Sequence, residues 1–531
     1  MNTSPQTSAS TTVRDAISRN VAFDMLARVG YLFSRFFIPP FVLARVSLEA
    51  YGLWSTAFIL VAYIGISTMG VANVNIKFVA EFSARGEYKR ANELLSTGLV
   101  LMLPGFAVLY AALWFGWPQL VPMLKISPAL QGDAKEVVLM VVAIFLVSLS
   151  LGCFGNALTG AQLGNYNQVS WVTGYTVETA LIFLFVGMGR GIRGLAEAFL
   201  IRTLVEESVG AFFAFRKLHW LRLSPRMFNR GSLRLLFSFG GVVQIASLLS
   251  IVLSSIERAV AAPLAGLAAT GLLDIGKKLP NMASSIPGAF ANAFLPAASY
   301  LQGGLEVSEE QKETIHKLYV KGSRYSNLVT AYFCGFTALL ALPLLDVWLG
   351  RRFEGAALLM VFFSVSTQIH LMTGSGTSML KGLGRPAEEF YYCIPNVLAL
   401  ALTLPAARLI TGRWTALSIG GGVAVATVLS ATFFVLRANR LMGVHLGEFL
   451  RRVVWPGIMP YLLAAPLALL FRAVPWGTGR WVLAGYVVSA GIGYSLVFLA
   501  TTYWIILDQG ERWWFVAIAR QRLGRLTEHT A

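Results

Sequence analysis

Residues 137–160 read VVLMVVAIFLVSLSLGCFGNALTG, 24 consecutive residues without a charged side chain. A helix needs roughly 20 apolar residues to cross a hydrocarbon core of about 30 Å, so this stretch is long enough to span a membrane. About fourteen such stretches can be placed, near residues 20–44, 51–80, 97–116, 137–160, 168–189, 195–215, 235–256, 266–299, 325–345, 356–379, 390–407, 414–436, 456–471 and 481–507. The sequence therefore predicts an all-α, polytopic membrane protein.

Little sequence remains outside these stretches. The longest gaps, near 117–136, 216–234 and 301–324, hold only about twenty residues each. Charged residues make up 13% of the chain, against about 25% of an ordinary soluble domain. No gap could fold into a nucleotide-binding or sugar-transferring domain, so the function is expected to lie within the membrane.

The formal net charge of +17 is unevenly distributed. If the N-terminus is cytoplasmic, the cytoplasmic segments carry about 25 Lys and Arg and the opposite loops about 12, which agrees with the positive-inside rule. The 216–234 loop contains no acid, and its basic residues are Arg216, Lys217, Arg222, Arg226, Arg230 and Arg234. The charge therefore predicts cytoplasmic termini and attraction to anionic headgroups, and it argues against nucleic acid as a partner.

Several classes of site are not expected. Cys153, Cys334 and Cys393 are isolated within or beside spans, and the five histidines form no cluster with metal-ligand spacing. The N-terminal tail lacks the basic-then-apolar pattern of a cleaved signal peptide. We therefore expect no disulfide framework, no metal and no cofactor, and a first span that stays in the mature protein.

The second half of the chain echoes the first. Tyr51-Gly52-Leu53 recurs as Thr270-Gly271-Leu272 at an offset of 219, and the same offset relates Ala72-Asn73 to Ala291-Asn292. Six spans per copy predict two pseudo-symmetric lobes in the same orientation, with a substrate path between them. The expected organisation is a tail 1–18, an N-lobe 19–216, a basic linker 217–234, a C-lobe 235–440, two appended spans within 441–507, and a tail 508–531.

Basic and polar side chains recur inside the predicted spans. A charge at the centre of a spanning helix costs about 2.5–3.5 kcal/mol on insertion scales, so such residues usually face a cavity or a partner. The candidates at helical spacing are Asp24, Arg28, Tyr31 and Arg35 in the first span, Asn73 and Lys77 in the second, Gln244 in the seventh, and Lys277, Lys278 and Asn292 in the eighth. They predict a hydrated cationic cavity. The alternative is local pairing, for which Asp24–Arg28 and Asp274–Lys278 have i,i+4 spacing.

Acidic residues gather in the fifth and sixth spans. Arg202 and Glu206 are an i,i+4 pair, which indicates a structural role, whereas Glu178 and Glu207 lack an obvious local partner. With Asp24, these two acids are the candidates to carry a coupling proton or sodium ion.

Short motifs resemble those of a known superfamily. Tyr51-Gly52-Leu53-Trp54 opens the second span, Gly86-Glu87-Tyr88 is followed by Ala91, and Leu158-Thr159-Gly160 precedes Gly164. With fourteen spans in two six-span lobes, the chain resembles the polysaccharide-transport branch of the multidrug/oligosaccharidyl-lipid/polysaccharide exporter superfamily through about residue 440.

The resemblance implies a non-enzymatic flippase of the bacterial inner membrane that moves undecaprenyl-pyrophosphate-linked O-antigen or exopolysaccharide repeat units. In the related lipid II flippases, first-span arginines and an eighth-span basic residue line the cavity. Arg28 fits that pattern, Arg35 fits it loosely, and Lys277 or Lys278 would stand for the eighth-span residue. The aspartate that follows the second arginine there is absent here, which argues against lipid II itself.

The expected headgroup contacts are Arg28, Arg35, Lys77, Lys277 and Lys278, because fixed cations replace the water of a pyrophosphate. The expected contacts to sugar hydroxyls are Tyr31, Asn73, Gln244 and Asn292. A polysaccharide polymerase and chain-length machinery are the expected protein partners.

Two other function classes remain open. An ion-coupled drug or cation exporter of the same superfamily would have a cavity dominated by acids. Glu178 and Glu207 leave this alternative open. A membrane-embedded polymerase would need a large exported loop, and the gaps between the predicted spans hold only about twenty residues. An acyltransferase would need a buried histidine with a partner, and His370 beside Gln368 supports this only weakly.

Overall fold

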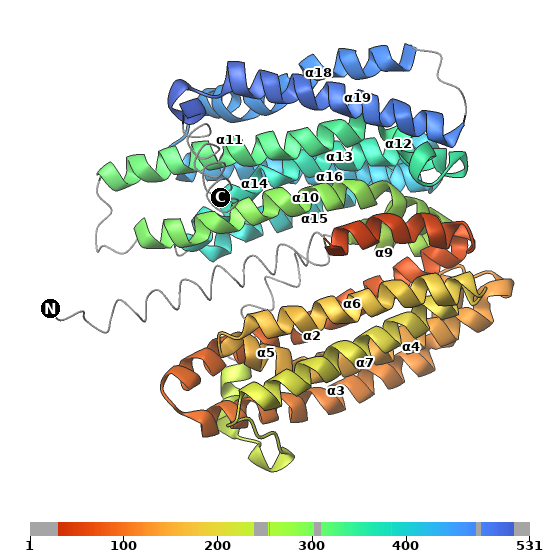
Figure 1. The fold of residues 1–531 in the computed structure, drawn as a ribbon, viewed down its shortest axis with the longest axis vertical. Helices are drawn as coiled ribbons and strands as arrows, with labels where there is room; N and C mark the ends of the chain where they lie inside the picture. Colours follow the sequence, from red (N-terminus) through yellow and green to blue (C-terminus); the bar gives the residue numbers. More distant parts are fainter. Residues whose placement is uncertain are drawn as a thin grey trace, which may run out of the picture. The chain divides into compact units, whose positions relative to one another are not determined.

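The computed structural model describes residues 30–237, 253, 255–301, 309–383, 385–473 and 479–513, and within that part of the chain the secondary structure is helical throughout. The first helix in it is Gly30–Leu43. The helices that follow are α2 Leu48–Ala84, α3 Tyr88–Met123, α4 Gln131–Leu151, α5 Cys153–Gly160, α6 Gly164–Gly187, α7 Gly191–Lys217, α9 Ile256–Ala265, α10 Leu267–Leu301, α11 Glu309–Leu339, α12 Ala341–Trp348, α13 Ala357–Leu371, α14 Thr373–Gly382, α15 Phe390–Thr411, α16 Ala416–Leu441, α17 Leu446–Phe449, α18 Trp455–Ala473 and α19 Arg480–Thr501 (Figure 1). The all-α prediction is confirmed.

Many of these helices are apolar enough to cross a membrane. Seven pass by length and composition among the described residues, from Tyr88–Met123 to Arg480–Ile506. An eighth candidate is the pair Gln311–Leu339 and Ala341–Trp348, which is bent by 74°. The chain is therefore a multi-pass membrane protein, and the total of fourteen spans stays a prediction.

The described chain forms two compact units. Unit 1 comprises the described residues up to Asp274 together with Trp414–Ala416, and unit 2 comprises Ile275–Arg413 and the described residues from Leu417 onward. The boundary lies inside α10. Each unit is described by itself below.

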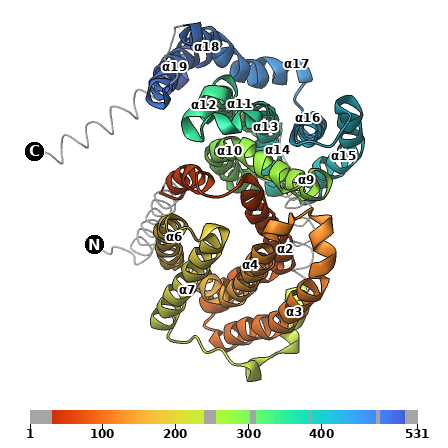
Figure 2. The same cartoon turned by 90° about the vertical axis from the view of Figure 1, so that its right-hand side faces the viewer.

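In unit 1, the helices α2 to α7 run alongside one another (Figure 1), and Figure 2 looks along them. The helix α2 begins at Ser47, whose hydroxyl accepts the Ala50 amide at 3.1 Å and so satisfies one of the free N–H groups of the first turn. Fully buried Leu94 and Leu95 of α3 and Leu158 of α5 belong to the core cluster of this unit. Since lipid is as apolar as leucine, this close packing stabilises the bundle mainly through van der Waals contact.

In unit 2, the helices α11, α13, α18 and α19 pack on one another. A core cluster joins Tyr319 of α11 to Phe434 of α16 and Phe449 of α17, each at most 1% exposed. The Tyr319 hydroxyl donates a hydrogen bond to Asn439 Oδ1 at 2.8 Å, which satisfies this buried group.

Equivalent positions of the predicted sequence repeat meet within unit 1. Gly52 of α2 and Gly271 of α10 are equivalent at the offset of 219. A Cβ atom on Gly52 would lie 1.8 Å from the Leu267 carbonyl oxygen, and one on Gly271 would lie 2.9 Å from the Leu48 carbonyl oxygen. Leu48 and Leu267 are also equivalent positions, so the contact is reciprocal. Only glycine permits backbones to approach this closely.

Candidate functional site

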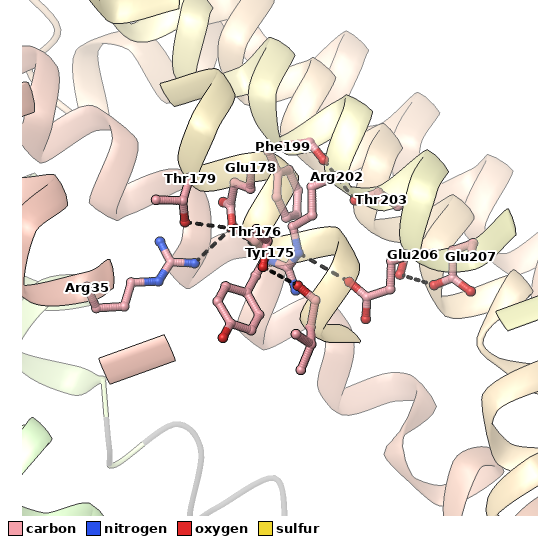
Figure 3. A network of polar contacts seen from close by, with 12 residues as sticks. Arg35, Tyr175, Thr176, Glu178, Thr179, Phe199, Arg202, Thr203, Glu206 and Glu207 are labelled. Atoms are coloured by element: carbon pink, nitrogen blue, oxygen red, sulfur yellow. Dashed lines mark hydrogen bonds and ion pairs between the residues drawn. The ribbon is translucent and has the colours of Figure 1, made fainter. Parts of the chain in front are cut away.

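A chain of alternating charges crosses three helices of unit 1 (Figure 3). Arg35 projects from the first described helix, and its Nη2 lies 3.2 Å from Oε2 of Glu178 on α6. The same oxygen lies 3.6 Å from Nη1 of Arg202 on α7, and Arg202 Nε lies 3.2 Å from Glu206 Oε2. The predicted Arg202–Glu206 pair is confirmed, and the Arg35–Glu178 pair is a contact that local spacing did not reveal.

The two ends of the Arg35–Glu178 pair differ in exposure. The Glu178 side chain is 2% exposed, whereas that of Arg35 is 25% exposed. A carboxylate so deeply buried costs several kcal/mol unless cations compensate it, and here Arg35 and Arg202 both do so. Arg35 Nε is buried and makes no hydrogen bond within the described part of the chain. Arg35 is thus the more accessible member of the pair.

A cluster of three aromatic rings adjoins this arginine through Tyr31. The guanidinium carbon of Arg35 lies 4.9 Å from the centre of the Tyr31 ring. The Tyr31 ring lies 5.2 Å from Trp171 and 5.9 Å from Tyr175, and Trp171 and Tyr175 are 4.8 Å apart. Aromatic faces offer a sugar ring an apolar surface, and the tyrosine hydroxyls offer it hydrogen bonds. A cation beside such a cluster can bind a molecule that carries both phosphate and sugar.

A cavity of about 490 Å³ lies elsewhere in unit 1, among α2, α3, α4, α5 and α7. Glu207 of α7 lines it and accepts a hydrogen bond from the Ser148 hydroxyl at 2.8 Å. Asn75 of α2 also lines it, and its buried Oδ1 has no hydrogen-bond partner among the residues that the structure describes. The remaining polar lining comes from Ser150, Asn156 and Ser255. A carboxylate and a free amide oxygen suit a proton or a monovalent cation.

A polar cluster fastens the start of α2 to α9 and the first turns of α10. Asp274 accepts hydrogen bonds from the Tyr51 hydroxyl at 2.8 Å and from Arg258 Nη1 at 3.0 Å. Arg258 also reaches the Ser55 hydroxyl at 3.4 Å, and its Nε lies 3.7 Å from Glu257 Oε1. The cluster lies beside the Gly52–Gly271 contact, which assigns these charges a structural role.

The predicted site residues of the eighth span lie in unit 2. Lys277 and Lys278 are half-buried on α10, and Lys277 Nζ lies 5.7 Å from the centre of the Phe363 ring on α13. The neighbouring Gly276 of α10 packs against Leu359 of α13.

The other predicted residues divide into two groups. Asn73 and Lys77 lie on α2 with exposed side chains, and Lys77 Nζ lies 4.8 Å from the centre of the Phe78 ring. Asp24, Arg28, Gln244 and the side chain of Asn292 lie outside the described part of the structure.

Sequence reasoning missed three contributors to these sites. Trp171 and Tyr175 are four residues apart on α6, a spacing that could have indicated a shared aromatic face. Asn75 gave no sequence signal, because only the fold shows that its amide oxygen is buried.

His370, the histidine considered for an acyltransferase, lacks a hydrogen-bond partner at Nδ1 among the described residues. His370 Nδ1 is buried without a hydrogen bond to any described residue, and its ring lies 5.0 Å from that of Tyr392. This environment gives no support to a catalytic pair.

Known proteins share the fold and the sequence pattern. The membrane protein EpsK of Bacillus subtilis (strain 168) is 20% identical over 515 residues, which cover 93% of this chain and 96% of EpsK. The lipid II flippase MurJ in an inward closed conformation superposes with a TM-score of 0.69 at 11% identity, over 90% of this chain and 99% of MurJ. An inward-facing multidrug resistance transporter of the MATE family gives 0.65 at 18% identity, over 78% and 94% of the two chains.

The fold is therefore that of the flippases and exporters to which MurJ and the MATE transporters belong, as the sequence motifs indicated. A family model described as polysaccharide biosynthesis protein matches residues 20–302, more than half of the sequence. This chain belongs to the polysaccharide biosynthesis protein family.

Proposed function

We propose that this protein is a flippase of the bacterial inner membrane that translocates undecaprenyl-pyrophosphate-linked oligosaccharides, such as O-antigen or exopolysaccharide repeat units. Family membership and the fold shared with a lipid II flippase support a lipid-linked substrate. The observation that carries the proposal is Arg35, a partly exposed cation beside Tyr31, whose ring packs with Trp171 and Tyr175.

The charge network explains how Arg35 could serve an anionic substrate without a large penalty. At rest, Glu178 compensates Arg35, so no bare cation is buried. A pyrophosphate carries more charge than one carboxylate and accepts paired hydrogen bonds from a guanidinium. When Arg35 turns to it, Glu178 keeps Arg202 as a partner at 3.6 Å. The substrate can therefore compete for Arg35 while Glu178 stays compensated.

Lys77, Lys277 and Lys278, with Arg28, are the further headgroup contacts in this proposal. Tyr31, Asn73, Gln244 and Asn292 are its contacts to the glycan. Alternating access between two lobes carries the headgroup, while the prenyl chain stays in lipid. A site of equal affinity on both sides moves nothing in a preferred direction, so ion coupling or consumption of the product must supply direction.

For ion coupling, the structure favours Glu207 over Glu178. Glu178 is already bound by two arginines, whereas Glu207 faces a cavity with one hydroxyl donor and the free Asn75 amide oxygen. Export from Glu207→Gln is expected to lose its dependence on the proton or sodium gradient. Normal export by both Glu178→Gln and Glu207→Gln at every pH and sodium concentration would exclude these acids as ion carriers.

The function is tested by deleting the gene and analysing the lipid fraction by mass spectrometry. A flippase predicts accumulation of a prenyl-pyrophosphate oligosaccharide, relieved by the unchanged gene. Arg35→Ala and Lys277→Ala should leave export at least tenfold lower, because each removes a charge-assisted hydrogen bond of about 1.5–3 kcal/mol. Arg413→Ala, which removes an exposed cation from the end of α15, is the matched control.

Membrane levels of all variants must match that of the unchanged protein. Normal export from both Arg35→Ala and Lys277→Ala would contradict the headgroup assignment. The cavity that Glu207 lines and the MATE-like fold favour a drug or cation exporter as the second candidate. An unchanged lipid pool with new sensitivity to cationic drugs would identify that function.

A further inference from the structure

The basic loop, residues 216–234, is held against the first turns of α3 by buried side chains. Asn92 binds it twice, since Nδ2 donates to the Trp220 carbonyl at 2.7 Å and Oδ1 accepts the Arg222 amide at 2.9 Å. Asn92 is 5% exposed, so these bonds are shielded from water. The path of the loop is therefore set by specific contacts.

Three further hydrogen bonds fix the second half of the loop. The Ser96 hydroxyl accepts the Ser224 amide at 3.2 Å, and the Thr97 hydroxyl accepts the Asn229 amide at 3.0 Å. Asn229 also donates from Nδ2 to Glu93 Oε2 at 2.6 Å. Its own Oδ1 accepts the Gly231 amide at 2.7 Å, which caps the helical segment 230–237.

Apolar contacts anchor the same segment. Leu218, Leu221 and Leu236 are each 5% exposed or less and belong to the core cluster of unit 1. The Trp220 ring stacks on Tyr88 of α3, with centres 5.2 Å apart and planes 17° apart. The loop is thus anchored in the core of unit 1.

All of the basic side chains of this loop point outward. The exposed residues are Arg216, Lys217, Arg222, Arg226, Arg230 and Arg234. Glu93, the carboxylate that binds the loop, is engaged by Asn229. The result is six exposed cations within a loop of nineteen residues whose backbone is held in place.

An insertion signal requires cations near a span but no defined conformation. This loop has five hydrogen bonds to α3 and two buried leucines, and together they define one conformation. We infer that the basic loop is a preformed docking site for the phosphate-bearing headgroups of anionic membrane lipids. The inference does not depend on the proposed function.

The surroundings favour lipid over a soluble phosphate compound. Phe215 on the last turn of α7, Phe228 in the loop and Phe237 after it are 53%, 43% and 64% exposed. Aromatic side chains beside arginines are typical of surfaces that sit at the headgroup level, where the rings enter the acyl boundary. A cluster of four to eight cations directly after a spanning helix is also typical of anionic lipid recognition, and the loop follows the predicted span 195–215.

The test counts lipids bound to the purified full-length protein by native mass spectrometry. Dioleoyl phosphatidylglycerol is titrated against dioleoyl phosphatidylcholine, with and without inorganic phosphate. The charge variant is Arg222→Gln/Arg226→Gln/Arg230→Gln. The control Arg351→Gln/Arg352→Gln/Arg413→Gln removes three exposed arginines elsewhere. The release variant, Asn92→Ala/Thr97→Val, keeps every charge but removes three of the five hydrogen bonds that hold the loop on α3.

We expect the charge variant to bind phosphatidylglycerol ten- to a hundredfold more weakly, at roughly fivefold per cation before screening by salt. The release variant should lose at least threefold, and the control variant should bind normally. Three results would each overturn the inference: equal losses in the charge and control variants, normal binding by the release variant, or displacement of phosphatidylglycerol by millimolar phosphate. Elution as a single folded species confirms that each variant is comparable.

Discussion

The Glu178→Gln substitution should destabilise the protein more than the combined removal of Glu178 and Arg35. Arg35 and Glu178 are 3.2 Å apart, and their attraction at an effective dielectric constant of about 20 is roughly 5 kcal/mol. Part of it is lost to solvent because Arg35 is 25% exposed. Loss of one partner of a buried pair costs about 3–5 kcal/mol, and we expect about 3 kcal/mol for Glu178→Gln.

The double variant Arg35→Gln/Glu178→Gln leaves the Arg202–Glu206 pair intact at 3.2 Å and leaves no unmatched charge in the network. It should therefore be only about 1 kcal/mol less stable than the unchanged protein, so the two substitutions are strongly non-additive. Glu309→Gln, in an exposed pair with Lys312, is the control and should change nothing measurable.

The chain contains its own reporter of unfolding. Cys153, Cys334 and Cys393 are free and buried, so a thiol-reactive fluorophore should react with them as the protein opens during heating. At an unfolding entropy of about 2.1 cal/mol/K per residue, 3 kcal/mol lowers the midpoint of a chain of 531 residues by about 3 °C. A double variant that falls by the sum of the two single effects would refute the coupling.

Further outcomes follow from other contacts. Gly52→Ala should strongly reduce the yield of folded protein, because its Cβ would lie 1.8 Å from a carbonyl oxygen. The control Gly105→Ala meets nothing within 4 Å and should be neutral or stabilising by up to about 1 kcal/mol. Equal yields of the two variants would contradict this prediction. Tyr51→Phe removes the 2.8 Å hydrogen bond to Asp274 and should cost about 1.5 kcal/mol by thiol-reporter melting, so an unchanged midpoint would exclude that bond. Glu388→Gln breaks the paired contact with Arg437 but, at partial exposure, should cost only about 1 kcal/mol, and a loss above 3 kcal/mol would show that the pair is structural.

Hydropathy located long apolar helices because a spanning helix needs about 20 apolar residues, and seven helices of the described part of the chain meet that requirement. The helix α3 and the pair α4–α5 cover the predicted spans 97–116 and 137–160. Local spacing also gave the Arg202–Glu206 pair, since both residues lie on one helix face.

Contacts between helices could not be read in this way. Arg35 and Glu178 are 143 positions apart, and Asp274 receives hydrogen bonds from Tyr51 and Arg258, on two other helices. Such pairs depend on the crossing of helices in space, which one sequence does not encode locally. The contacts between α3 and the basic loop could not be predicted for the same reason. Asn92 and Arg222, for example, are 130 positions apart.

The Gly52–Gly271 contact has an evolutionary consequence. Equivalent residues meet across it in both directions, as they do in the isologous interface of a two-fold symmetric dimer. A chain that arose by gene fusion would have inherited this contact from a homodimer in which one glycine served both sides. Fusion then allowed the two sides to diverge: Ser55 and Asp274 occupy equivalent positions at the offset of 219, and Arg258 now binds both. If the predicted duplication is correct, a symmetric ancestor could not have placed a hydroxyl and a carboxylate there at once, and this cluster would be a specialisation that became available only after the halves were joined.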